Sequence, residues 1–381
     1  MNILILSEYY PPHIGGLETF CANVAEGLVS QGHNVRVVTI QLPSTKSYEE
    51  VNRVEVHRVK VPRMGERYWF SLLAIPVALR LVRDCDIVHT TTYTATFPAW
   101  LATRLGRKPC VVTVHELFLS LWHSLSGMNL LSALVHEVLE RLTIALPFEK
   151  YVSVSKYTRN LLESAGVASE KCELIYNGVQ TDIFDPEKFN AREIRRILGL
   201  EDDFVCLFYG RPGVSKGVEY LIQAVPRISE EISSFKLLLI LAREPRKGFD
   251  RTKNLIDELE VAERIVLLDP VPLHELPGYV LCADCIVVPS LSEGFGLSVA
   301  ESCSMRKPIV ASAVGAIPEV ISGNYILIPP KDPDCIAKAV ISMERKRADF
   351  TKGTPLKIFD WNDAVESYTK VYEHLLNCRR P

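Results

Sequence analysis

The chain has 381 residues, of which 48% are hydrophobic, so it is long enough to form two domains with buried cores. Its formal net charge of -3, from 43 Lys and Arg against 46 Asp and Glu, excludes the strongly basic surface that is typical of nucleic-acid binding. Ten cysteines lie mostly inside apolar segments, which indicates small core residues in a reducing compartment such as the cytoplasm.

The N-terminal part of the chain predicts a strand, a loop, a helix and a second strand. Residues 2–7 and 35–39 are apolar runs, and residues 17–29 repeat apolar side chains at helical spacing. The first run lacks a preceding basic region, so we expect a strand there and not a secretory signal. Gly15 and Gly16 stand before the helix, where unobstructed backbone N–H groups can hold a phosphate or a sugar.

Two apolar segments suggest contact with a membrane surface. Residues 68–81 predict a helix that carries aromatic side chains behind Arg63 and Arg67, a combination found on anionic membranes. Residues 117–135 contain no Asp, Glu, Lys or Arg, but polar residues interrupt them, which favours a surface contact over a span. The alternative for the helix at 68–81 is that it only covers a sheet.

His115 follows an apolar strand at residues 110–114. The carboxyl ends of parallel strands carry the ligand-binding edge of an α/β sheet, so its imidazole is expected where it can hydrogen-bond or accept a proton. The alternative is a histidine satisfied by the neighbouring backbone.

Two spacings resemble metal sites, and neither predicts one. Cys282 and Cys285 have the spacing of zinc ligands, but no second pair of Cys or His residues completes the set. Asp84 and Asp86 precede a strand, where only the non-functional end of a parallel sheet is expected. We therefore expect no metal.

The alternation of strands and helices restarts at residues 204–209. This strand leads into a glycine-containing loop with Arg211 and Lys216, followed by a helix. A guanidinium, an ammonium and the free N–H groups of a helix start together favour an anion. Solvated surface charges are the alternative.

Two carboxylates, Glu293 and Glu301, follow the apolar strand at residues 285–289. Gly294 and Gly296 allow the backbone to approach a ligand closely, and the helix expected after them directs its N–H groups toward an anion. Carboxylates accept hydrogen bonds from sugar hydroxyls, so the two residues can contact different parts of one ligand. The alternative is that Glu293 caps the helix and Glu301 is solvated.

Together these motifs resemble the retaining glycosyltransferases of family 4, which have the GT-B fold. They are Pro-Pro-x-x-Gly-Gly-x-Glu, the strand-end His, Asn-Gly-Val, Gly-Arg-x(4)-Lys-Gly, Glu-x(7)-Glu, Pro-x-Val-Ala and Ile-Pro-Glu-Val, and they span nearly the whole chain. The resemblance implies an α/β fold with two Rossmann-like, doubly wound parallel-sheet domains facing a cleft. Residues 1–176 would form the acceptor-binding domain, residues 177–358 the nucleotide-sugar-binding domain, and residues 359–381 a helix packing back on the first domain.

The resemblance also implies roles for single residues. Arg211 and Lys216 would neutralise the donor diphosphate, and Glu301 would hold the ribose. Glu293 would contact the transferred sugar, and His115 would lie near the reacting carbon. The implied catalytic residues are His115, Glu293, Arg211 and Lys216. The implied nucleotide-sugar-binding residues are Gly15, Gly16, Arg211, Lys216, Val271 near the nucleobase, Glu293, Gly294, Phe295, Gly296, Leu297 and Glu301.

The implied reaction is retaining transfer of a hexose-type sugar from a UDP- or GDP-sugar to a lipid-linked or saccharide acceptor. No cofactor or metal would be needed, because cationic side chains stabilise the leaving phosphate. The net charge gives no reason to expect a nucleic-acid partner. The expected location is the cytoplasm, with peripheral contact at the inner membrane face. Two alternatives stay open, a GT-B nucleotide-sugar epimerase and a non-catalytic nucleotide-sugar-binding protein.

Some positions depart from the family pattern. Gln180 replaces a common Asp, and Arg306 stands where a helix-ending Gly of positive φ is usual. These departures concern donor and acceptor details, because no residue of the implied site is lost.

Overall fold

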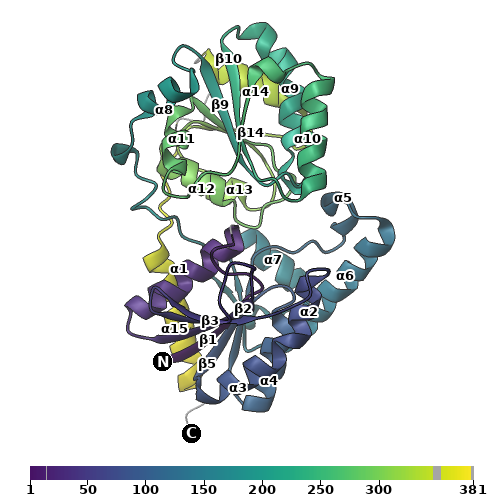
Figure 1. The fold of residues 1–381 in the computed structure, drawn as a ribbon, viewed down its shortest axis with the longest axis vertical. Coiled ribbons are helices and arrows are strands. Elements are labelled where there is room, and N and C mark those ends of the chain that lie inside the picture. Colours follow the sequence, from purple (N-terminus) through teal and green to yellow (C-terminus); the bar gives the residue numbers. More distant parts are fainter. Residues whose placement is uncertain (14, 346–352, 379–381) are drawn as a thin grey trace. The chain divides into compact units, whose positions relative to one another are not determined.

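The computed structural model describes residues 1–13, 15–345 and 353–378 (Figure 1). The chain forms two compact units. The first unit contains Met1–Ser120, Leu134–Gly178 and the C-terminal segment from Phe359, and the second contains Leu121–Ala133 and Val179–Ile358. Within the described ranges, no helix combines the length and apolar composition needed to cross a membrane.

The first unit is built on a sheet that, among the described residues, has eight strands in the order β3-β4-β2-β1-β5-β6-β7-β8. Neighbouring strands are parallel except for the antiparallel pair β3 and β4. The order reverses at β1, which lies between β2 and β5, as in a doubly wound sheet. The strands are β1 (Asn2–Leu6), β2 (Asn34–Ile40), β3 (Tyr48–Val51), β4 (Val54–Val59), β5 (Ile87–Thr91), β6 (Cys110–Val114), β7 (Lys150–Ser153) and β8 (Cys172–Leu174).

Helices cover both faces of this sheet (Figure 1). The C-terminal helix α15 lies beside α1, although the two come from opposite ends of the chain. Its Tyr372 hydroxyl lies 2.7 Å from Nδ1 of His89 in β5, so the helix is bonded into the core of the first unit. The helices are α1 (Gly16–Ser30), α2 (Glu66–Leu73), α3 (Ile75–Leu81), α4 (Thr96–Gly106), α6 (Leu130–Ala145), which begins in the segment of the second unit, α7 (Lys156–Ser164) and α15 (Trp361–Asn377).

The second unit is built on a wholly parallel sheet that, within the described part of the chain, has six strands in the order β11-β10-β9-β12-β13-β14. Its order reverses between β9 and β12. The strands are β9 (Phe204–Gly210), β10 (Phe235–Leu241), β11 (Ile265–Leu268), β12 (Cys285–Val288), β13 (Ile309–Ser312) and β14 (Tyr325–Ile328). The helices are α5 (Trp122–Ser126), α8 (Ala191–Leu198), α9 (Val218–Glu231), α10 (Arg246–Glu258), α11 (Leu276–Cys282), α12 (Leu297–Ser304), α13 (Ile317–Val320) and α14 (Pro333–Glu344).

The single helix predicted at residues 68–81 is wrong in detail, because α2 ends at Leu73 and α3 begins at Ile75. Pro76 lies in the first turn of α3, where the missing N–H of proline is tolerated, whereas in a continuous helix it would remove a hydrogen bond. By contrast, Arg306 adopts φ 55°, the left-handed conformation that the family pattern indicated for this position. Residues 346–352 of the predicted second domain (177–358) lie outside the described residues.

Candidate active site

The strand order of the second unit brings two sequence-distant loops together. β9 and β12 are hydrogen-bonded neighbours at the point where the order reverses, so the loops after both strands leave the same edge of the sheet. Crevices at such a switch point are the usual ligand sites of α/β sheets. The loops are bonded directly, because the backbone N–H of Leu291 donates to the carbonyl oxygen of Ser215 at 2.6 Å.

An ion pair between Lys216 and Glu293 forms the centre of this edge. Nζ of Lys216 lies 2.6 Å from Oε1 of Glu293, and the Ser290 hydroxyl donates to the same oxygen at 2.8 Å. Glu293 is only 6% exposed, so the pair is held partly away from water. Both contacts made by this carboxylate within the described structure use Oε1, which leaves Oε2 to accept a hydrogen bond from a ligand.

Two glycines allow the backbone to hold this pair in place. Gly217 has φ 63°, and a Cβ there would lie 2.1 Å from the carbonyl oxygen of Pro289. Gly315 has φ 55°, and a Cβ there would lie 2.2 Å from the carbonyl oxygen of Glu293. That oxygen instead accepts a hydrogen bond from the Ala316 N–H at 2.9 Å. The close backbone approach therefore requires glycine at both positions.

The helix expected near Leu297 is α12, and Gly296 is its N-cap residue. No described side chain caps this helix, so its first-turn N–H groups and positive dipole end are available to an anion. Phe295 is buried, which anchors the turn that leads from Gly294 into the helix. The turn and the helix start thus lie next in sequence to the carboxylate of Glu293.

Glu301 lies within α12 and is bonded to Tyr209 of β9. The Tyr209 hydroxyl lies 3.0 Å from Oε2 of Glu301 and 2.9 Å from the carbonyl oxygen of Ser298, and it can donate its one proton to either acceptor. The Glu301 residue is only partly buried overall, but burial of its carboxyl group raises its pKa from about 4.5 to about 7, and the Tyr209 bond opposes this rise. Sequence reasoning missed Tyr209, although its place at the end of β9 was a usable signal.

The pKa of Glu301 predicts a dependence of stability on pH. The folded protein binds the proton of the Glu301 carboxyl more tightly than the unfolded chain does. The resulting contribution to the free energy of unfolding is complete below about pH 4.5 and is lost as pH rises through about 7. Glu301→Gln stays neutral and can still accept from Tyr209. We expect this variant to gain thermal stability relative to wild type at pH 8 and not at pH 5. An equal difference in melting temperature at both pH values would contradict the assignment.

Arg211 and Val271 lie further from the pair of Lys216 and Glu293 along the sheet edge. Arg211 is exposed at the end of β9, in the same loop as Lys216. Val271 follows β11, at the edge of the sheet, with β10 and β9 between that strand and β12. The structure therefore brings Lys216 and Glu293 into contact, while Arg211 and Val271 lie further out along the same carboxyl edge.

In the first unit, His115 lies against the N-terminal part of α1. Its ring centroid is 4.4 Å from that of Phe20, four residues after the N-terminal Gly16. Burial lowers the pKa of His115 to about 4, a shift that the charge of Glu18 partly opposes. The imidazole is therefore neutral near pH 7, and its buried Nε2 has no hydrogen-bond partner among the described residues. It is suited to accept or donate one hydrogen bond.

Sequence reasoning missed the role of a carboxylate at the start of α1. Glu18 is 6% exposed, and its Oε1 lies 2.7 Å from Nδ1 of His13. A Cβ on the N-cap residue Gly15 would lie 2.4 Å from Oε2 of Glu18. The Gly15–Gly16 turn is thus already lined by a negative group, which weakens it as a phosphate cradle and favours a hydroxyl or a cation. The Gly-Gly-x-Glu spacing was the available signal.

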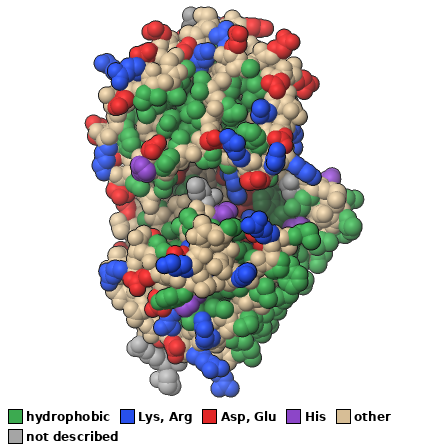
Figure 2. Space-filling model, in the orientation of Figure 1, with side chains coloured by type: hydrophobic (Ala, Val, Ile, Leu, Met, Phe, Trp, Pro, Cys, Tyr) green, Lys and Arg blue, Asp and Glu red, His purple; other side chains and the backbone are tan. Residues whose placement is uncertain are grey.

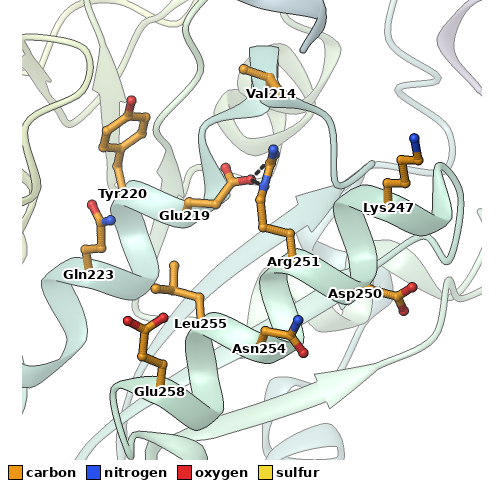
Figure 3. A pocket seen from close by; sticks show the side chains of 10 residues that line it. All are labelled: Val214, Glu219, Tyr220, Gln223, Lys247, Asp250, Arg251, Asn254, Leu255 and Glu258. Carbon is orange, nitrogen blue, oxygen red and sulfur yellow. Dashed lines mark hydrogen bonds and ion pairs between the residues drawn. The ribbon is translucent and has the colours of Figure 1, made fainter. Parts of the chain in front are cut away.

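A separate groove lies between the outer helices α9 and α10 of the second unit (Figure 3). It encloses about 650 Å³, and Nε of Arg251 donates to Glu219 across it at 2.8 Å. Of the two active-site loops, only the one after β9 borders it, through Val214. Arg251 and Glu219 in its wall already form an ion pair, and we do not assign the groove a ligand.

The described residues offer no metal centre, because no three His, Cys, Asp or Glu side chains among them converge as ligands. The thiol of Cys282 contacts the carbonyl oxygen of Tyr279 at 3.1 Å, and that of Cys285 contacts the carbonyl oxygen of Ile286 at 3.6 Å. Both cysteines are buried and serve as core residues.

Comparison with known proteins adds a family assignment to this geometry. Residues 14–183 match the family model for glycosyltransferase family 4, and residues 190–354 match that for glycosyl transferases group 1. The chain is 31% identical to an uncharacterised glycosyltransferase of Methanocaldococcus jannaschii, over 98% of each chain. It is 27% identical to the GDP-mannose-dependent alpha-(1-6)-phosphatidylinositol monomannoside mannosyltransferase of Mycolicibacterium smegmatis, over 89% of this chain and 88% of the relative.

Solved structures confirm the predicted GT-B fold. Sucrose-phosphate synthase from Thermosynechococcus elongatus superposes with a TM-score of 0.81 at 21% identity, covering 99% of both chains. HepE of Anabaena, in complex with UDP and glucose, superposes with a TM-score of 0.77 at 19% identity, covering 98% of this chain and all of HepE. At these identities the likeness establishes the fold and not the ligand.

Proposed function

Because this chain belongs to glycosyltransferase family 4, we propose that it is a retaining hexosyltransferase that uses a nucleotide diphosphate-sugar. The observation that carries this proposal is the buried contact between Lys216 and Glu293 at the switch point of a parallel sheet, next to the uncapped start of α12. A cation and open N–H groups suit a diphosphate, while a carboxylate suits sugar hydroxyls.

The proposed chemistry stabilises the leaving diphosphate. Departure of the nucleotide places negative charge on the phosphate oxygens, and Lys216, Arg211 and the first-turn N–H groups of α12 would receive that charge. This arrangement supplies positive charge without a metal or other cofactor. The leaving phosphate would then help to remove the acceptor proton, and the new bond would form on the face that the nucleotide leaves.

Glu293 has a separate part in the proposal. Its Oε1 holds Lys216 while Oε2 would accept a hydrogen bond from the transferred sugar. Glu301 would accept hydrogen bonds from the ribose, and its ionised form can accept from two hydroxyls because neither oxygen carries a proton. Donor affinity is therefore expected to rise with pH through about 7, the pKa of Glu301. In the first unit, the neutral His115 would bond the sugar or the acceptor close to the reacting carbon.

The donor and the acceptor are proposed as classes. A UDP- or GDP-hexose is supported by a GDP-mannose-dependent relative and by a structural neighbour that holds UDP and glucose. A lipid-linked or saccharide acceptor is supported by the relative whose name specifies a phosphatidylinositol monomannoside. We further propose a cytoplasmic protein with peripheral contact at the inner membrane face.

A donor panel tests the proposal. Purified protein is mixed with UDP- and GDP-sugars, and both the thermal shift and the turnover with lipid and saccharide acceptors are measured. We expect one donor to raise the melting temperature and to be consumed only with an acceptor, and NMR of the product should show the anomeric configuration of the donor. Epimerised donor formed without acceptor would identify an epimerase, and binding without reaction would identify a binding protein. Either result overturns the proposal.

A further inference from the structure

Helix α6 turns carboxylates inward and leucines outward, the reverse of an ordinary amphipathic surface helix. Glu140 is 2% exposed, and its Oε1 accepts a hydrogen bond from the backbone N–H of Phe118 at 3.0 Å. Oε2 of Glu137 accepts one from the backbone N–H of Ser120 at 2.6 Å. The inner side of the helix thus holds the loop that follows His115, and its large aliphatic side chains are left facing solvent.

The outward side chains of α6 join those of α2 in one apolar surface, which we call the leucine face. The Tyr68 hydroxyl of α2 lies 2.7 Å from Nε2 of His136 in α6, so the two helices are in contact. Figure 2 shows hydrophobic side chains gathered over this part of the first unit. All members are exposed, Leu134 by 58% and Leu142 by 59%: Tyr68, Trp69, Leu72, Leu73, Leu134, Val135, Val138, Leu139 and Leu142.

A surface of this kind is unusual, because exposed apolar side chains normally occur singly. Burying such side chains stabilises a complex in proportion to the apolar area removed from water. Packing within the described residues does not supply this burial, so the leucine face needs a partner.

The charges around the leucine face indicate what that partner is. In residues 61–80 and 121–145, every exposed charged side chain of the described structure is an arginine. The acidic residues of these segments are turned away, since Glu66 bonds the Tyr9 hydroxyl and the other two hold the loop after β6. The arginines are Arg63, Arg67, Arg80 and Arg141. Arg67 pairs with Glu8 at 3.4 Å and Arg141 pairs with Glu137 at 2.6 Å, so their charges are partly neutralised. The charges that these segments expose are nevertheless all positive.

Because the exposed charges at the rim are arginines, two possible partners of the leucine face can be distinguished. A second copy of this chain, joined by a two-fold axis, would bring the same arginines together and add repulsion to the contact. An anionic bilayer offers the opposite charge at its headgroups and an apolar layer beneath them. Tyr and Trp side chains such as Tyr68 and Trp69 are favoured at that boundary. We propose that the leucine face docks onto the surface of an anionic lipid bilayer.

In the docked state α6 would lie along the surface and not across it. The helix has 16 residues, or roughly 24 Å at 1.5 Å per residue, and it carries the charged Glu137, Glu140 and Arg141. Its aliphatic side chains would enter the acyl boundary, while the arginines bind lipid phosphates.

Docking would also bring the carboxyl edge of the first sheet close to the lipids. Arg67 of α2 reaches that edge, because its Nε lies 3.4 Å from Oε2 of Glu8, which follows β1. His115 follows β6 at the same edge of the same sheet. The inference deepens the proposed function, on which this last step rests, by selecting the lipid-linked class of acceptor.

The test measures vesicle binding without donor or acceptor, so that its failure is distinct from a failure of sugar transfer. Full-length protein is sedimented with phosphatidylcholine vesicles and with vesicles that also contain about 30% phosphatidylglycerol. The variant Leu134→Ser/Val138→Ser/Leu142→Ser removes apolar area from the leucine face. The matched control Ile197→Ser/Leu273→Ser/Ile358→Ser removes exposed apolar side chains from the second unit. All six positions are exposed, so we expect both variants to fold, which melting temperatures check.

We expect wild type and the control variant to bind the anionic vesicles, and the leucine-face variant to bind at least about tenfold more weakly. Arg63→Glu/Arg141→Glu is expected to abolish the preference for phosphatidylglycerol. Equal binding by the leucine-face variant and wild type overturns the proposal, as does a wild type that binds no vesicles. Light scattering tests whether the surface instead binds a second copy of the chain. A wild type that is dimeric, with a leucine-face variant that alone is monomeric, would assign the surface to a second copy and overturn the proposal.

Discussion

Replacing Glu293 with glutamine is expected to lower the rate of sugar transfer by about 100- to 1,000-fold, the range typical of losing one preorganised group that stabilises developing charge. Glutamine keeps the size of the side chain and can still accept from the Ser290 hydroxyl. It removes the negative charge that positions Lys216 at 2.6 Å. Transfer is measured with the donor identified by the panel. We expect kcat to fall more than KM rises, because the charge of Glu293 stabilises the transition state more than the bound substrate.

Folding should survive this change. The substituted side chain is nearly isosteric, and Lys216 remains 30% exposed, so water can hydrate its ammonium group and the cost should stay near 1 kcal/mol. Glu219→Gln is the matched control, because Glu219 also pairs with a cation of the second unit, Arg251, but in the outer groove (Figure 3). That variant should transfer sugar at a rate within about twofold of wild type. Normal turnover by Glu293→Gln would contradict the role proposed for this carboxylate.

Replacing Gly217 with alanine is expected to destabilise the second unit and to weaken donor binding together. The new Cβ would lie 2.1 Å from the carbonyl oxygen of Pro289, and φ 63° is costly for a residue with a Cβ. The loop after β9 must then move away from the loop after β12, which separates Lys216 from Glu293. We expect a loss of about 2–4 kcal/mol in the free energy of unfolding and a melting temperature lower by roughly 5–10 °C.

Gly213→Ala is the control for this prediction. Gly213 lies in the same loop, has φ -91°, and a Cβ there would meet nothing nearer than Oγ of Ser215 at 3.9 Å. Alanine should therefore leave the melting temperature within about 1–2 °C of wild type, or raise it slightly by restricting the unfolded chain. The steric argument fails if both variants melt at the same temperature.

The alternation of apolar strands and amphipathic helices was sufficient to predict two parallel-sheet units from the sequence. Each apolar run is local, and its length and flanking glycines distinguish a buried strand from a helix. The antiparallel β3 (Tyr48–Val51) was not predicted, because its two adjacent glutamates resemble a loop. The helices α8 and α10 were missed for a related reason, since their many charged residues obscure the few apolar positions between them.

The candidate site divides in the same way. Glu293, Glu301, Arg211 and Lys216 were found from glycine-bracketed spacings at strand ends, because the carboxyl end of a parallel strand is predictable from the strand itself. Tyr209 and Glu18 were not assigned a role. The role of each depends on a hydrogen bond that the sequence does not show. Tyr209 bonds Glu301, and Glu18 bonds His13.

The sequence by itself determined the fold class, the family and the chemical types at the site, because these depend on local periodicity and on motifs read along the chain. The tertiary structure alone decided three other properties. Strand order placed the loops after β9 and β12 side by side and so paired Lys216 with Glu293. Burial raised the pKa of Glu301 to about 7. Packing turned the carboxylates of α6 inward, where they accept hydrogen bonds from two backbone N–H groups of the loop after β6, and left its leucines exposed.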